Sequence, residues 1–152
     1  MRNRLLGAVL AVCVAAPAFA QDFTAKQLQA LYDTVAPAVC IVSYSSNVTN
    51  PGSGEVSKRN TRALGLIVSA KGLVMAHGHM QLQDSDPFSI KISTGQGDNE
   101  QEYDGKLLSK PDDVNVCFVE IVNDKNVLFP HVDFVSAPLK LGDPLALIGL
   151  MG

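Results

Sequence analysis

Residues 63–80, ALGLIVSAKGLVMAHGHM, contain two short apolar runs separated by a turn. Residues 63–69 and 72–76 are rich in aliphatic and β-branched side chains, which favour strands, and the glycine at the turn favours a tight reversal. This pattern predicts two adjacent strands that lead directly into His77 and His79.

Five further runs of the same kind flank this pair, each bounded by Gly, Pro, Asn, Asp or Ser. They span residues 38–44, 88–93, 102–109, 115–122 and 143–150. Seven short strands with tight turns are typical of an all-β domain. We therefore predict a single antiparallel β-barrel of six or seven strands over residues 38–152. Residues 45–61 form the longest polar stretch, and we predict a surface loop there.

One helix is expected before the strands. Leu28, Leu31, Tyr32 and Val35 recur at spacings of three and four, which is the period of an amphipathic helix. Thr24 is a suitable N-cap, so the helix is predicted over residues 24–35, ended by Pro37. Residues 21–37 then make up the helix and the segment leading into the first strand.

The first twenty residues have the pattern of a secretory signal peptide. Arg2 and Arg4 precede a short apolar run, and small residues precede a cleavage site expected after Ala20. A retained membrane anchor is the alternative, but Pro17 interrupts a run that would need about 20 apolar residues to span a bilayer. We expect a periplasmic or secreted protein.

The net charge indicates which partners are excluded, and the cysteines indicate which thiols could pair. Residues 21–152 carry 12 − 2 = 10 basic and 15 acidic residues, a net charge of −5, which argues against nucleic acid or an anionic membrane as a partner. Cys40 and Cys117 are the two cysteines in this range, and both lie in apolar runs. We expect two separate buried thiols, although a disulfide between them remains open.

The two histidines at the end of the second run allow three interpretations. Residues two apart in a strand share a face, so His77 and His79 could hold one metal ion, but zinc needs three or four ligands and the third histidine, His131, is remote in sequence. A histidine at a strand end also suits a general base, and exposed histidines without a function are common there. We predict no metal site.

The surrounding sequence resembles the segment around the catalytic histidine of trypsin-like serine proteases of the HtrA/Deg type. In that family a Gly-Ser-Gly-Phe-Ile-Ile strand, a turn ending in glycine and a second apolar strand lead into Thr-Asn-x-His-Val. Gly65 and Gly72 match the glycines of that pattern, with Ala63 and Leu64 in place of its first Gly-Ser. The histidine of the motif falls on His79, and His77 takes a neighbouring, non-catalytic position.

Three other segments are similar to the same family in the same order. They are residues 35–43, 110–121 and 137–152, so that the resemblance covers residues 30–152. It implies the first of two trypsin-type barrels and an exported serine endopeptidase that uses no cofactor. His79 would then be the general base.

One departure concerns the acid of the catalytic triad. The resemblance places Asn115 where the family has aspartate, and an amide at that position lowers turnover by about 10⁴-fold in serine proteases. Asp112 or Asp113 could substitute for it, or both could be solvated turn residues. We interpret Asn115 as a degraded orienting position.

The nucleophile is the second departure. The family's serine and oxyanion hole follow in a second barrel, and this sequence reaches Gly152 without such a motif; the serine in residues 51–55, PGSGE, is interpreted as part of a turn. We expect the N-terminal half of a protease, inactive alone, either as a truncated gene product or as a fragment. Its partners would be a polypeptide substrate or the missing second barrel, and self-association is expected. The alternative is a non-catalytic pseudo-protease or a polypeptide-binding envelope module.

Overall fold

The computed structural model of the chain describes residues 23–80, 87–95, 97–111 and 113–148. The predicted signal peptide and residues 149–150 of the last predicted strand lie outside these ranges. Within them, no helix combines the length and the apolar character needed to cross a membrane.

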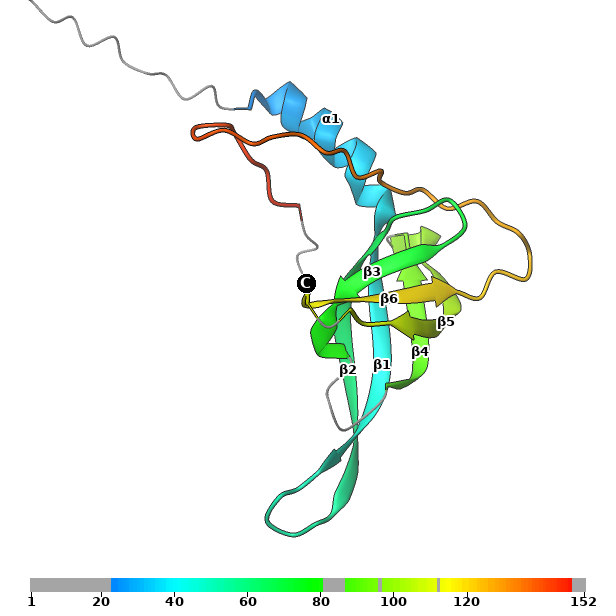
Figure 1. Cartoon of the computed structure of the whole chain (residues 1–152). Coiled ribbons are helices and arrows are strands. Elements are labelled where there is room, and N and C mark those ends of the chain that lie inside the picture. The colour runs from blue at the N-terminus through cyan, green and yellow to red at the C-terminus, as the bar shows by residue number, and fades with distance from the viewer. Residues whose placement is uncertain (1–22, 81–86, 96, 112, 149–152) are drawn as a thin grey trace, which may run out of the picture.

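The helix α1 spans Ala25–Val35, which confirms the prediction from its apolar spacing. A capping box closes its first turn: the Thr24 side chain accepts a hydrogen bond from the Gln27 backbone N–H, and the Gln27 side chain accepts one from the Thr24 backbone N–H. A 3₁₀ turn, Ala36–Ala38, contains Pro37 and leads into the first strand. The helix buries none of its residues and stands at one end of the barrel (Figure 1).

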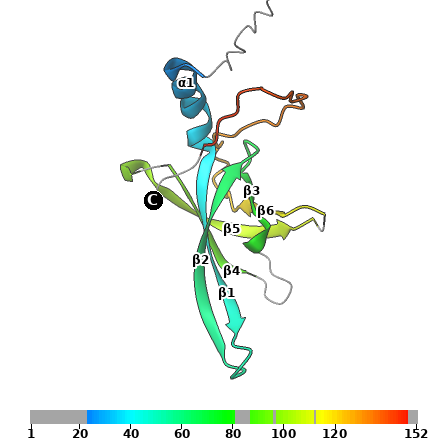
Figure 2. The same ribbon diagram turned by 90° about the vertical axis from the view of Figure 1, so that its left-hand side faces the viewer.

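Six antiparallel strands form a closed barrel (Figures 1 and 2). The strand order around it is β1-β2-β3-β6-β5-β4, and β4 pairs with β1 to close it. Strands β1 to β4 thus have the spatial order 4-1-2-3 of a Greek key, and β5 and β6 fill the remaining gap. The predicted all-β antiparallel barrel is confirmed, with six strands. Their bounds are β1 Val39–Thr49, β2 Val56–Ile67, β3 Leu73–His77, β4 Phe88–Thr94, β5 Gln101–Ser109 and β6 Val116–Ile121.

The barrel interior is packed with aliphatic side chains and the two thiols. Gly65 on β2 leaves room for this packing, because a Cβ there would lie 2.8 Å from the Cys40 sulfur and 2.8 Å from a Val74 methyl group. Cys40 and Cys117 are both buried and both free, so the expected separate core thiols are found. The largest fully buried side chains are Ile67, Met80, Ile92, Ile121, Val42, Val74, Val119, Cys40 and Cys117.

The segment after β6 folds back over one end of the barrel. The Phe129 backbone N–H donates to the Ala70 carbonyl (3.0 Å), and the Phe129 ring is buried edge-on against Tyr103 with centroids 5.2 Å apart. The Val132 N–H donates to the Ile67 carbonyl (3.1 Å). These contacts seal the β2–β3 turn against the core, although residues 122–148 contain no strand within the described part of the chain.

Two sequence predictions are wrong. The surface loop expected over residues 45–61 is instead a long hairpin, because β1 continues to Thr49 and β2 begins at Val56. An Asx turn reverses the chain: the Asn50 side chain accepts from the Gly52 N–H (2.9 Å), and the Gly54 N–H donates to the Asn50 carbonyl (2.8 Å).

The strand expected over residues 143–150 does not form in the described residues 143–148. No described strand pairs with this segment to satisfy its backbone groups, and the register of the closed barrel leaves no place for a seventh strand. It begins instead at a turn in which the Lys140 backbone N–H donates to the Asp143 carboxylate (2.7 Å). Leu145 and Leu147 of this segment are exposed.

Candidate functional site

The pairing of β3 with β6 brings the two histidines to Asn115. β3 ends at His77, which is the register partner of Val116 on β6, so residue 115 lies beside the end of β3. The chain then turns through the 3₁₀ segment Gly78–Met80, which places His79 next to His77. A hydrogen bond from the Gly78 N–H to the Asn115 carbonyl (3.0 Å) holds the two segments together.

His77 lies between His79 and Asn115 and contacts both. The Nδ1 atoms of His77 and His79 are 2.7 Å apart, and the two rings are nearly parallel, with centroids 4.4 Å apart. On its other side, His77 Nε2 lies 3.3 Å from Nδ2 of the Asn115 amide. All three side chains are exposed, so the cluster is open to solvent and to a ligand.

Glycine at position 78 is what allows the amide to approach the rings. A Cβ at this position would lie 2.5 Å from Asn115 Oδ1 and 2.9 Å from the Asn115 backbone carbonyl carbon. Any larger residue would therefore push the strand end and the turn apart. The cluster depends on the sequence His-Gly-His as a unit rather than on two independent histidines.

The hydrogen bonds indicate where the protons lie. The His79 backbone N–H points at His77 Nδ1 (3.3 Å), so this nitrogen acts as an acceptor. The proton between the two rings then belongs to His79 Nδ1, which leaves His79 Nε2 with a free lone pair. A neutral His77 that accepts at Nδ1 has its proton on Nε2, where the structure places Nδ2 of Asn115; a half-turn about χ2 would bring the amide oxygen there as the acceptor.

An apolar pocket of about 330 Å³ adjoins the cluster. His77 and Asn115 form part of its wall, whereas His79 is absent from the lining. The other walls come from α1, the barrel strands and the C-terminal segment, namely Val35, Val39, Leu64, Gly65, Leu66, Met75, Ala76, Val116 and Ile148. The geometry offers an apolar surface beside a polar, proton-carrying cluster.

The remaining sequence-predicted candidates that the structure describes make no hydrogen bond or ion pair with this cluster. Asp113 is exposed and makes no hydrogen bond or ion pair with a described residue, and Asp112 lies outside the described residues. His131 contacts the Phe129 carbonyl (3.2 Å) and lies 3.8 Å from Asp133. Within the described ranges, no group of three or more His, Cys, Asp or Glu residues is placed to hold a metal ion.

The two thiols are not nucleophiles of this site. Burial raises the pKa of the Cys40 thiol from 9.0 to about 12. Burial also raises the pKa of Cys117, whose thiol donates to the His77 carbonyl (3.4 Å). Both remain protonated at neutral pH, and the thiolate is the reactive form. Cys117 instead ties the end of β3 to the core.

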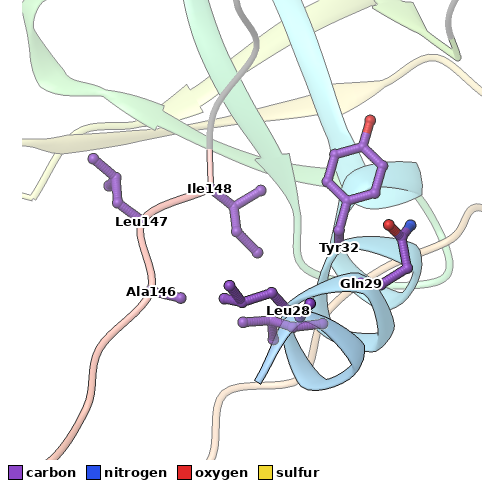
Figure 3. Close-up of a pocket in the computed structure, with 8 residues that line it drawn as sticks. Leu28, Gln29, Tyr32, Ala146, Leu147 and Ile148 are labelled. Carbon is purple, nitrogen blue, oxygen red and sulfur yellow. The ribbon is translucent and has the colours of Figure 1, made fainter. Parts of the chain in front are cut away.

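A second apolar pocket lies between α1 and the C-terminal segment (Figure 3). It has a volume of about 440 Å³, and Leu28 of α1 and Ile148 face the same space. Its lining contains no histidine, cysteine or carboxylate, and its one hydroxyl is that of Tyr32, so it offers a mainly hydrophobic surface. The lining residues are Ala25, Leu28, Gln29, Leu31, Tyr32, Ala146, Leu147 and Ile148.

We expect residues 21–152 to self-associate at micromolar concentration. The C-terminal segment exposes large apolar side chains along its length, and contiguous apolar surface of this kind drives association. Static light scattering should report particles larger than a monomer, and Leu141→Glu combined with Leu147→Glu should reduce their size. Lys140→Glu is the control for added charge alone, and a sharp monomer peak for the unaltered chain would contradict the prediction. The exposed residues are Phe134, Val135, Leu139, Leu141, Leu145 and Leu147.

The structure bears on the sequence interpretation in one specific way. His79 and Asn115, assigned as general base and degraded acid position, are brought to one site, but the direct contact to Asn115 is made by His77. His77, which the sequence interpretation placed in a non-catalytic position, is therefore the residue that contacts the other two.

No protein-family model and no curated protein matches the chain.

Proposed function

We propose that this chain is the N-terminal barrel of an exported HtrA-type serine endopeptidase homologue, inactive on its own. The observation that supports the proposal is the placement of His77, His79 and Asn115 at one end of a six-stranded Greek-key barrel, beside an apolar pocket. His79 takes the role of general base, and the site would act on polypeptide. The proposal rests on this geometry together with the four sequence resemblances.

The proton arrangement suits His79 to this role. In a serine protease the base accepts a proton through one imidazole nitrogen while a third group holds the proton on the other. Here His79 Nδ1–H donates to His77, and His79 Nε2 is left to accept from a hydroxyl. His77, backed by Asn115, thereby occupies the place of the orienting carboxylate. A neutral imidazole stabilises an imidazolium less well than a carboxylate does, so this arrangement would assist proton transfer less than a triad with aspartate.

Turnover also requires groups that the described residues do not supply to this cluster. Within the described ranges, no serine or threonine hydroxyl is hydrogen bonded to either imidazole. Acyl transfer needs a nucleophile for the base to deprotonate and donors for the developing oxyanion. We therefore expect no casein cleavage and no labelling by a fluorophosphonate probe when residues 21–152 are assayed alone. Stoichiometric labelling would contradict this.

The proton arrangement can be tested by nuclear magnetic resonance of the imidazole nitrogens. We expect the neutral His79 ring to carry its proton on Nδ1, and His77→Ala to move it toward Nε2 because the acceptor is lost. His77→Gln is the matched control, since its amide oxygen still accepts. If His79 carries its proton on Nε2 in the unaltered chain, the role of His77 is wrong, while the protease resemblance would still stand on its sequence motifs.

A chemical test uses diethyl pyrocarbonate, which acylates an unprotonated imidazole nitrogen. No described residue is hydrogen bonded to His79 Nε2, whereas both nitrogens of His77 have a partner, and breaking a hydrogen bond costs about 1 kcal/mol. We expect His77 to react roughly five- to tenfold more slowly than His79 when sites are mapped by mass spectrometry. His79→Ala should speed the acylation of His77, because it removes the imidazole that donates to the unprotonated Nδ1 of His77. Equal rates in the unaltered chain would contradict the arrangement.

A non-catalytic polypeptide-binding module is the second candidate. Asn115 favours it, because the site lacks the carboxylate that an efficient triad requires. The two candidates differ in what the reading frame beyond codon 152 encodes. An in-frame Gly-x-Ser-Gly-Gly stretch would support the protease homologue, and its absence would support the binding module.

A further inference from the structure

The outer half of the β1–β2 hairpin extends beyond the barrel as a two-stranded ribbon (Figures 1 and 2). β3 pairs with β2 only from Gly65 onward, so residues 56–64 of β2 pair with β1 on one side alone. We call residues 56–64 the ribbon edge. Within the described part of the chain, no strand pairs with its outer side. An edge of this length is a template for another strand.

The register shows which backbone groups of the ribbon edge point outward. The Val68 N–H donates to the Leu73 carbonyl, so even-numbered residues of β2 turn their backbone groups toward the β3 side. The β1–β2 register runs from residue 56 to residue 66 without a shift. Lys58, Asn60 and Arg62 therefore direct their N–H and C=O groups away from β1, where an added strand could bind them.

The ribbon edge is also positively charged in a chain with a net charge of −3. Lys58, Arg59 and Arg62 are exposed, and none forms an ion pair with a described carboxylate. Lys58 lies 5.4 Å above the centroid of the Phe88 ring and has no other charged contact among these residues. The one acidic residue of the hairpin, Glu55, lies in its turn.

Charge limits which strand can occupy this edge. A second copy of the ribbon would bring Lys58 and the two arginines against their own kind, and like charges on paired strands are destabilising. An acidic strand is attracted by the same three cations. The cations therefore favour an acidic partner and disfavour a second copy of the ribbon. We propose that the ribbon edge binds an extended acidic segment of another polypeptide by strand addition.

The proposal defines how the acidic residues should be spaced. Side chains alternate between the two faces of a strand, so Lys58 and Arg62 lie on one face of the ribbon and Arg59 lies on the other. Acids at alternate positions of the bound segment reach Lys58 and Arg62. The backbone of the segment pairs with the outward groups of Lys58, Asn60 and Arg62. This surface is separate from the histidine cluster, so the inference does not depend on the proposed protease function.

The test is fluorescence anisotropy of a fluorescein-labelled (Glu-Thr)₄ peptide titrated with residues 21–152. We expect saturable binding of the peptide to the unaltered chain. Binding should be about tenfold weaker with Asn60→Pro, because proline lacks the outward N–H but is compatible with an edge strand. Asn60→Ala is the matched control, because both variants lose the hydrogen bond from Ser45 to the Asn60 side chain. Lys58→Gln with Arg62→Gln should weaken binding and reduce its salt dependence.

Two further peptides keep the proposal open to refutation even if Asn60→Pro does not fold. (Glu-Thr)₄ N-methylated at every residue has the same charge but no backbone N–H on either edge, and it should bind the unaltered chain at least about tenfold more weakly than (Glu-Thr)₄. (Lys-Thr)₄ should not bind. Equal binding of the N-methylated and the unmodified (Glu-Thr)₄ would mean a general polyanion surface and would overturn strand addition, as would no binding of (Glu-Thr)₄. His79→Ala should leave binding unchanged, and a loss there would contradict the separateness of this site.

Discussion

Replacing Phe129 by alanine is expected to lower the free energy of unfolding by about 3–5 kcal/mol. The ring is 5% exposed, closes one end of the barrel and packs edge-on against Tyr103. Its backbone is held to the β2–β3 turn by the bond to Ala70, so the site cannot readily collapse around the missing side chain. Urea unfolding followed by circular dichroism measures the change.

Phe134 provides a matched control five residues later in the same segment. It is 69% exposed, and its replacement by alanine should change stability by less than about 0.5 kcal/mol. Comparing the two substitutions separates the effect on stability of removing any aromatic ring from the effect of opening the end of the barrel. Equal effects of the two substitutions would mean that residues 122–135 do not cover the barrel in solution.

The hairpin strands at residues 63–76 could be predicted because their signals are local. Apolar runs with a glycine turn specify two strands and the reversal between them. Within residues 63–76 the structure differs from the prediction only in ending β2 at Ile67 and beginning β3 at Leu73. The helix before them was equally accessible, because the Thr24 cap and the apolar period lie within one segment. These features need no knowledge of the partner strands.

The two wrong predictions have opposite physical causes. The ribbon was missed because both of its faces meet solvent, so residues 56–60 show no alternation of polar and apolar side chains. Residues 143–148 are apolar and strand-like, but a strand forms only where a neighbour satisfies its backbone groups, and composition does not reveal the neighbour. The burial of Phe129 was missed for a related reason, because a single aromatic residue before a proline gives no repeating pattern from which burial could be predicted.

The candidate site was accessible from sequence only in part. The resemblance led to His79 and Asn115, and the barrel topology brings the segments that carry them together. The insertion of His77 between them depends on side-chain directions at the end of β3 and on the close approach permitted by Gly78. Residue spacing alone does not distinguish which of two histidines, two positions apart, contacts a third residue from another strand.

Raising the pH above 9 is expected to destabilise the fold through Cys40. Cys40 lies on β1, is 1% exposed and belongs to the buried core, and burial raises the pKa of its thiol from 9.0 to about 12. In the unfolded chain the thiol loses its proton near pH 9, whereas in the fold it keeps the proton until about pH 12. Unfolding therefore releases a proton within this window, and rising pH favours the unfolded chain.

The stabilising contribution of the buried thiol is complete below pH 9 and is lost as the pH rises to 12. Its slope is about 1.4 kcal/mol per pH unit, which amounts to roughly 4 kcal/mol over the whole window. Urea unfolding at half-unit steps from pH 8 to 11, in a non-thiol reductant, measures the slope. Cys40→Ala should have a lower free energy of unfolding than the unaltered chain below pH 9. As the pH rises, its free energy of unfolding should fall less steeply, by about 1.4 kcal/mol per pH unit. Cys117, whose pKa burial also raises, is present in both chains, so its contribution cancels. Parallel slopes would show that Cys40 is not sealed inside the barrel.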